Sequence, residues 1–157
     1  MKFSKIKATD RKVVLIWTTN EHGVETEHHV TSEEEPKPEF PKALDAFVPF
    51  VMELLGLGDN STFRNDLHVT GLSIDVGEDE RRGLVITCRK WLGRTNGPLI
   101  FNLPHIREPK SDGTEAPIAG VWLPGMDKAL QKVQVQAQKY LDGERAQTEM
   151  ELAGSKA

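Results

Sequence analysis

Six segments of the chain combine β-branched or aromatic residues with an alternating hydrophobic pattern, which is typical of strands. Residues 13–18 (VVLIWT) are apolar on both faces and fit an interior strand, whereas residues 24–31 alternate and fit a half-buried one. The remaining predicted strands are residues 3–9, 67–76, 84–91 and 98–103. Polar or glycine-containing turns separate the first three strands from one another, and likewise the last three. We therefore expect two antiparallel meanders.

Apolar residues spaced by three and four positions predict two helices. The first starts near Pro41, is kinked at Pro49 and ends at Gly56 and Gly58. Its apolar stripe is Phe40, Leu44, Phe47, Val51 and Leu54. The second extends from about residue 124 to about residue 151, with the stripe Met126, Leu130, Val133, Ala137 and Tyr140. The residues beyond Gly143 lack such a stripe, so 140–154 is interpreted as a frayed tail or a peptide that a partner captures.

The resulting order is βββα–βββα, and its two halves are similar in sequence. RKVVLIW (11–17) matches RGLVITC (82–88), and PKALDAF (41–47) matches DKALQKV (127–133). We therefore predict an α+β fold, a tandem βββα–βββα pseudo-repeat in which an antiparallel sheet carries two helices on one face. The expected organisation is one domain over residues 1–157, with halves 1–58 and 63–151 and a flexible tail at 152–157. The predicted core places Leu44, Phe47, Val51, Leu130 and Val133 against Leu15, Trp17, Leu72, Ile74 and Ile86.

Charge is distributed unevenly along the chain. The 157 residues carry a net charge of −4, so no global basic field draws the protein to DNA. Residues 63–110 are nevertheless the only positive third, with 8 basic and 6 acidic side chains. The single cysteine, Cys88, excludes an intramolecular disulfide and suits a reducing compartment. With no apolar segment at the N-terminus and none long enough to cross a bilayer, we expect a cytoplasmic protein.

The positive third contains the stretch CRKWLGRTNG (88–97), in which three cations surround a tryptophan. Strand alternation places Arg89 and Trp91 on the face that the helices leave uncovered. An exposed aromatic ring beside cations suits single-stranded nucleic acid, because the ring stacks on bases while the cations contact phosphates. The candidate nucleic-acid-binding residues are Arg81, Arg82, Arg89, Lys90, Trp91 and Arg94. The alternative is an ordinary charged hairpin end, with Trp91 packed against the loop at 107–121.

Signatures of catalysis and of metal binding are missing from the sequence. There is no nucleophile motif, phosphate-binding loop or dinucleotide fingerprint. His28 and His29 are adjacent on a predicted strand and point to opposite faces, so they do not converge on one ion. Cys88 is expected on the core side as a small buried hydrophobe. We predict a non-enzymatic protein without cofactor or metal.

Three stretches resemble small tailed-phage and prophage proteins of the DNA-metabolism region: YLDGERAQ (140–147), VTGLSI (69–74) and GLVITCRK (83–90). The resemblance implies phage DNA metabolism in the cytoplasm of the host cell as the setting and implies no mechanism. Two hypotheses follow. The protein is a phage-type accessory factor that binds nucleic acid, expected to be single-stranded, through an open sheet face. Alternatively, it is a protein-interaction module that takes over a host protein or recruits a replication protein, with no affinity for nucleic acid.

Overall fold

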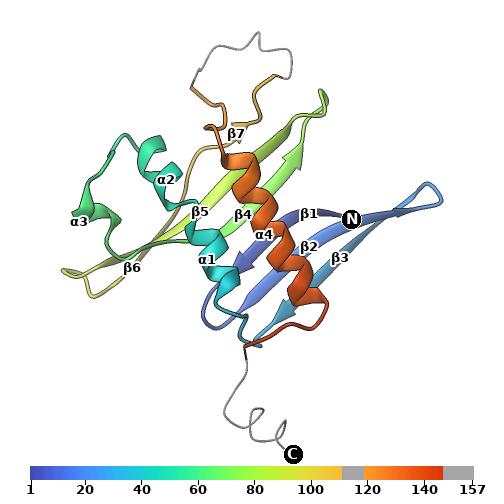
Figure 1. The fold of residues 1–157 in the computed structure, drawn as a ribbon, viewed down its shortest axis with the longest axis horizontal. Coiled ribbons are helices and arrows are strands. Elements are labelled where there is room, and N and C mark those ends of the chain that lie inside the picture. The colour runs from blue at the N-terminus through green and yellow to red at the C-terminus, as the bar shows by residue number, and fades with distance from the viewer. Residues whose placement is uncertain (111–118, 147–157) are drawn as a thin grey trace, which may run out of the picture.

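A computed structural model describes residues 1–110 and 119–146 of the chain (Figure 1). In chain order the strands are β1 (Lys2–Ala8), β2 (Val13–Glu21), β3 (Val24–Ser32), β4 (Leu67–Val76), β5 (Arg82–Leu92), β6 (Gly97–Asn102) and β7 (Ile106–Arg107). The helices are α1 (Glu39–Asp45), α2 (Val48–Leu54), α3 (Ser61–Arg64) and α4 (Met126–Leu141). All six predicted strands are present, and the short β7 is additional.

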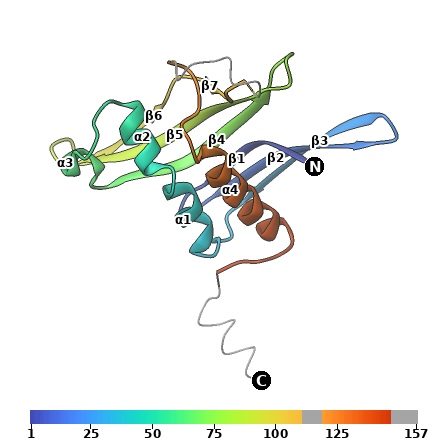
Figure 2. The same ribbon diagram turned by 45° about the horizontal axis from the view of Figure 1, so that its top comes forward.

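The strands form one open antiparallel sheet in the order β3-β2-β1-β4-β5-β6, with β7 paired to the far end of β5. Helices α1 and α4 cross the same face of this sheet, as Figures 1 and 2 show from two directions. The molecule is therefore an α+β protein with helices on one face, as predicted. We call the opposite face of the sheet the open face.

The helical layer differs from the prediction in three places. The first predicted helix is two helices, because Pro49 has no N–H to continue the hydrogen-bond ladder and lies instead in the first turn of α2. The short helix α3, capped by the side chain of Asn60, was not predicted. Helix α4 ends at Leu141 rather than near residue 151, and Gly143 follows with a φ of 103°.

The core lies between the sheet and the helices and contains the expected residues. Both predicted helical stripes face inward, and Leu44, Leu130 and Val133 have no solvent exposure. Of the ten predicted core residues, nine are buried, whereas Trp17 is only partly buried. Trp17 packs against the edge of this core, and its ring stacks on His28 with centroids 5.1 Å apart. Among the residues that the structure describes, no helix is long and apolar enough to cross a membrane.

Candidate nucleic-acid interface on the open sheet face

The six predicted site residues occupy three different environments. Leu84, Ile86 and Cys88 of β5 are buried towards the helices, as expected. Arg89 and Trp91 alternate with them and lie on the open face, where Trp91 is 40% exposed. Their cross-strand partners on this face are Ile100 and Pro98 of β6.

Lys90 belongs to the covered face rather than to the candidate surface. It follows the same alternation as Cys88 and is only 9% exposed. Its ammonium donates hydrogen bonds to the backbone carbonyls of Thr62 and Asn65 and lies 5.8 Å from the centroid of the Phe63 ring. Lys90 therefore anchors α3 to the sheet and lies on the side of β5 opposite Arg89 and Trp91.

Arg81 and Arg82 lie at the opposite end of β5 from Trp91, and both are paired with carboxylates. The Arg81 Nε atom is 2.6 Å from Asp79 Oδ2. Arg82 forms a two-pronged pair with Glu108, with Nε 2.7 Å from Oε1 and Nη2 3.3 Å from Oε2. These arginines lower the pKa of the Asp79 and Glu108 carboxyl groups, chiefly through side-chain hydrogen bonds. Arg81 thus pairs within the β4–β5 turn, and Arg82 ties the start of β5 to the segment after β7, at the opposite end of β5 from Trp91.

Arg94 lies in the turn between β5 and β6. Together with Trp91 and Phe63 it lines a hollow of about 560 Å³ between this turn and α3. Arg94 has no ion-pair partner in the described part of the chain. Of the six predicted residues, Lys90, Trp91 and Arg94 line this hollow, while Arg89 lies two residues before Trp91 on the open face.

Two lysines that were not predicted belong to the same surface. In β1, Ile6 and Ala8 are buried towards the helices, so Lys5 and Lys7 lie on the open face. Strand pairing places Lys7 opposite Gly71 of β4 and Gly71 opposite Thr87 of β5. The stem of Lys7 packs over Gly71, since a β-carbon on this glycine would lie 3.6 Å from it, an ordinary contact distance. The alternation of FSKIKAT indicated this face, but only the β1–β4 pairing places these lysines near β5.

The middle of the open face is uncharged, and acidic groups lie towards its ends. Between the lysines of β1 and Arg89 of β5, the sheet presents Gly71, Ser73, Val85 and Thr87. Asp75 lies beyond them and is held by His105, whose Nε2 atom is 2.9 Å away. Glu25 and Glu27 lie in the half of β3 nearest the β2–β3 hairpin tip. We call Lys5, Lys7, Arg89 and Trp91 the cation–aromatic surface.

A second hollow, of about 420 Å³, lies where β4 separates from the β1–β2 turn. His68 lines it with Nδ1 2.9 Å from Asp45 Oδ2, while Asp45 Oδ1 accepts the Val69 N–H at 3.1 Å. Arg89 lines the same hollow, but Asp10 and Glu35 do too, so charges of both signs meet there. Sequence reasoning missed this pair because Asp45 and His68 are 23 residues apart. No nucleophilic side chain is hydrogen-bonded to His68 among the described residues.

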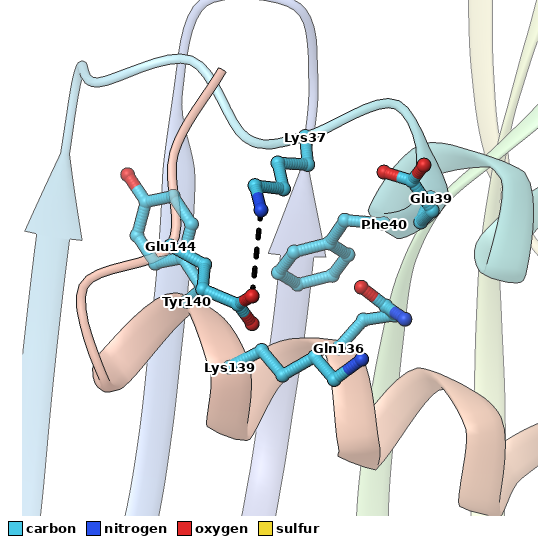
Figure 3. A pocket seen from close by; sticks show the side chains of 7 residues that line it. All are labelled: Lys37, Glu39, Phe40, Gln136, Lys139, Tyr140 and Glu144. Carbon is cyan, nitrogen blue, oxygen red and sulfur yellow. Dashed lines mark hydrogen bonds and ion pairs between the residues drawn. The ribbon is translucent and has the colours of Figure 1, made fainter. Parts of the chain in front are cut away.

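A third hollow, of about 260 Å³, lies between residues 37–40 and the end of α4 (Figure 3). Phe40 and Tyr140 meet edge to face across it, with ring centroids 6.1 Å apart, and Lys37 Nζ is 3.4 Å from Glu144 Oε1. The Tyr140 hydroxyl donates to the Glu34 carbonyl at 2.6 Å. Residues 140–146 are therefore clamped onto the segment after β3 and are not a frayed tail; 147–157, which include the predicted flexible tail, lie outside the described residues.

The possible metal ligands are dispersed over the described residues, and the single thiol is buried. In residues 1–110 and 119–146 no three His, Cys, Asp or Glu side chains are grouped to hold a metal ion. Cys88 is buried, and desolvation raises the pKa of its thiol to about 12. A thiol with so high a pKa is not a nucleophile at neutral pH.

Comparison of the chain with protein-family models, with curated proteins and with solved structures found no match in any of the three. The class is therefore defined by the fold and the surface alone. The protein is an α+β protein whose antiparallel sheet is covered by helices on one face and carries a cation–aromatic surface on the other.

Proposed function

We propose that this protein is a non-enzymatic, phage-type accessory factor that binds single-stranded nucleic acid on the open face of its sheet. The observation that carries the proposal is the position of the cation–aromatic surface. Its three cations share one face with an exposed tryptophan, and none of the three has an ion-pair partner within the described residues. Unpaired cations on one face are what contact with a phosphate backbone requires.

Stacking and charge have separate parts in this proposal. A base stacks on the exposed Trp91 ring, while Lys5, Lys7 and Arg89 contact phosphates. Neighbouring strands are about 4.8 Å apart, so the lysines of β1 and Arg89 of β5 are separated by two strand spacings, roughly 10 Å. The uncharged floor of Gly71, Ser73 and Thr87 leaves room for the strand between them. An unpaired base is required because a base inside a duplex does not expose its face to Trp91.

We further infer that the two halves arose by internal duplication. The strands of each half follow one another outward from the centre of the sheet, β1-β2-β3 in one direction and β4-β5-β6 in the other. The central pairing of β1 with β4 is antiparallel and is centred on Ile6 and Leu72. Such an order supports a pseudo-two-fold axis between these residues. The test is a superposition of residues 3–55 on 67–141, which should align three strands and a helix in the same order.

The deciding experiment is a fluorescence titration of the protein with labelled single-stranded DNA across a range of salt concentrations. Trp91→Ala should weaken binding by about 1–3 kcal/mol at every salt concentration, because a stacking contact carries no charge. Lys5→Ala and Lys7→Ala should each flatten the dependence of log K on log salt by about 0.7. The matched control is Lys132→Ala on the exposed side of α4, which should leave the slope unchanged. Absence of wild-type binding to any strand at low salt would end the proposal.

A second candidate function is a protein-interaction module without nucleic-acid affinity. The observation in its favour is the net charge of −4, with 11 acidic and 7 basic side chains in residues 1–62. This acidity repels phosphates and attracts a basic protein partner, for example a host or replication protein. The same titration separates the two candidates, because this one requires that neither single nor double strands bind at low salt.

A further inference from the structure

The edge strand β6 is exposed, apolar and free of charge. Its sequence is GPLIFN, without an ionisable side chain, and it is the last strand on its side of the sheet. Ile100 is 66% exposed and Leu99 is 43% exposed, on opposite faces of the strand. Edge strands usually carry charges, which prevent other strands from adding to them. β6 lacks this protection.

The hydrogen-bond pattern shows which backbone groups of β6 point away from the sheet. The Leu103 N–H, just after the strand, donates to the Ile86 carbonyl of β5 at 2.9 Å. Inward and outward residues alternate in an antiparallel pair, so Leu99 and Phe101 also bond to β5. Pro98, Ile100 and Asn102 therefore direct their backbone groups outward. At Ile100, in the middle of these three, neither the N–H nor the C=O has a loop or turn partner within residues 1–110 and 119–146.

The other edge of the sheet has a different character. β3 contains Glu25, Glu27 and two histidines, so this edge carries ionisable side chains. In antiparallel pairing across a two-fold axis only the residue on the axis meets its own copy, so a charged residue there would face a like charge, whereas a neutral residue would not. The neutrality of β6 and its central outward-facing residue satisfy this requirement of self-pairing.

We propose that β6 pairs antiparallel with β6 of a second copy of this chain, with the two-fold axis at Ile100. Ile100 then faces Ile100 of the second copy and exchanges two backbone hydrogen bonds with it. Each Asn102 N–H donates to the Pro98 carbonyl of the other copy. Proline supplies no N–H at this position, which limits the junction to four such bonds. This pairing does not depend on the proposed nucleic-acid binding.

The consequence is one continuous sheet with a doubled open face. Arg89 lies beside Ile100 across the β5–β6 pair, so the two Arg89 side chains would be separated by the two Ile100 side chains. An interface made by a single strand on each side is small, so we expect a dimer that dissociates on dilution into the micromolar range.

The first test is sedimentation velocity without nucleic acid, at loading concentrations that span roughly 100-fold around the micromolar range. The wild type should shift from monomer to dimer, and Ile100→Lys should weaken the association at least about tenfold, because it places two like charges in contact across the axis. The matched control is Val24→Lys, which alters a 64% exposed residue on the β3 edge and should dimerise normally. A wild type that is monomeric at all concentrations would overturn the proposal. So would a dimer that Ile100→Lys leaves intact while circular dichroism confirms its fold.

A second test examines the register. In the proposed pairing the two Ile100 Cα atoms are about 5.5 Å apart, which is within disulfide range. Ile100→Cys should therefore cross-link to a covalent dimer on mild oxidation. Leu99 faces Phe101 of the other copy, and two Leu99 positions are about 8 Å apart, so Leu99→Cys should cross-link much more slowly. The native Cys88 is buried and does not compete. Equal cross-linking at both positions would refute the register and with it the proposed axis.

Discussion

Lys90 and Arg89 are neighbours in β5, and replacing each by methionine should produce opposite phenotypes. Methionine keeps most of the unbranched stem of either residue and removes the charge. Lys90→Met should destabilise the protein and leave nucleic-acid affinity unchanged, because the ammonium lies on the covered face. Arg89→Met should leave stability unchanged and weaken binding, because the guanidinium lies on the open face without an ion-pair partner in the described part of the chain.

The size of the Lys90 effect follows from its contacts. The ammonium donates to two backbone carbonyls, those of Thr62 and Asn65, and the bond to Thr62 is long at 3.4 Å. One good hydrogen bond to a charged group contributes about 1.5–3 kcal/mol. Thr62 and Asn65 are exposed, so water can hydrate their carbonyls in the variant. The loss should therefore be near the lower limit, about 1.5 kcal/mol, or about 3–6 °C in Tm for a chain of this size.

Arg89→Met should change the free energy of unfolding by no more than about 0.5 kcal/mol. It should also reduce the salt dependence of single-strand binding by about 0.7, which corresponds to the loss of one phosphate contact. The assay pairs urea denaturation with a DNA titration on the same preparations, at a temperature where both variants are folded. If Lys90→Met lowered affinity without lowering stability, the assignment of the two side chains to opposite faces would be wrong.

Three further predictions concern the core and the pH dependence. Leu130→Ala should cost about 2–5 kcal/mol in urea denaturation, because Leu130 is fully buried in α4; a cost below about 1 kcal/mol would place that helix face in solvent. Gly83→Ala should break the His105–Asp75 pair, because its β-carbon would lie 2.0 Å from His105 Nε2. The free energy of unfolding should fall by about 0.5–1.5 kcal/mol, and by less in a His105→Ala background. An equal loss in both backgrounds would contradict this geometry. Cys88 should resist thiol reagents in the folded protein, and rapid labelling of the native protein at pH ~8 would refute its burial. Stability should also fall as pH rises from 9.0, the ordinary pKa of a cysteine thiol, towards its pKa of about 12 in the folded protein. Over this range only the unfolded chain releases the thiol proton.

Local patterns sufficed to predict most of the fold. Alternation located the six main strands and the covered face of β5, and the spacing of apolar residues located the inward stripe of α4. Short turns then made sequential strands neighbours, which fixes the order within each half. The break between α1 and α2 was predicted only as a kink, because sequence spacing does not reveal whether a helix resumes in line after a proline.

The candidate site was less predictable, for two physical reasons. Lys90 was assigned to the surface because it is charged, although its alternation with Cys88 placed it on the covered face. A lysine stem can be buried when its ammonium reaches carbonyls, as it does here at the end of α3. The second reason is that the groups which lie near the other cations in the fold are distant from them in sequence. Glu108 is 26 residues from Arg82, and Lys5 approaches β5 only through the pairing of β1 with β4.

Stability accounts for some of the charged and aromatic residues and not for others. Lys90 anchors α3, Arg82 holds Glu108, and Tyr140 clamps the segment after β3. Lys5, Lys7 and Arg89 form no ion pair within the described residues, and Trp91 leaves 40% of its surface in water. Placing three like charges on one face raises their mutual repulsion, and exposing a tryptophan forgoes hydrophobic stabilisation. The described residues supply no ion pair for these three cations, and under the proposed function a strand of nucleic acid neutralises the charges and covers the exposed part of the ring.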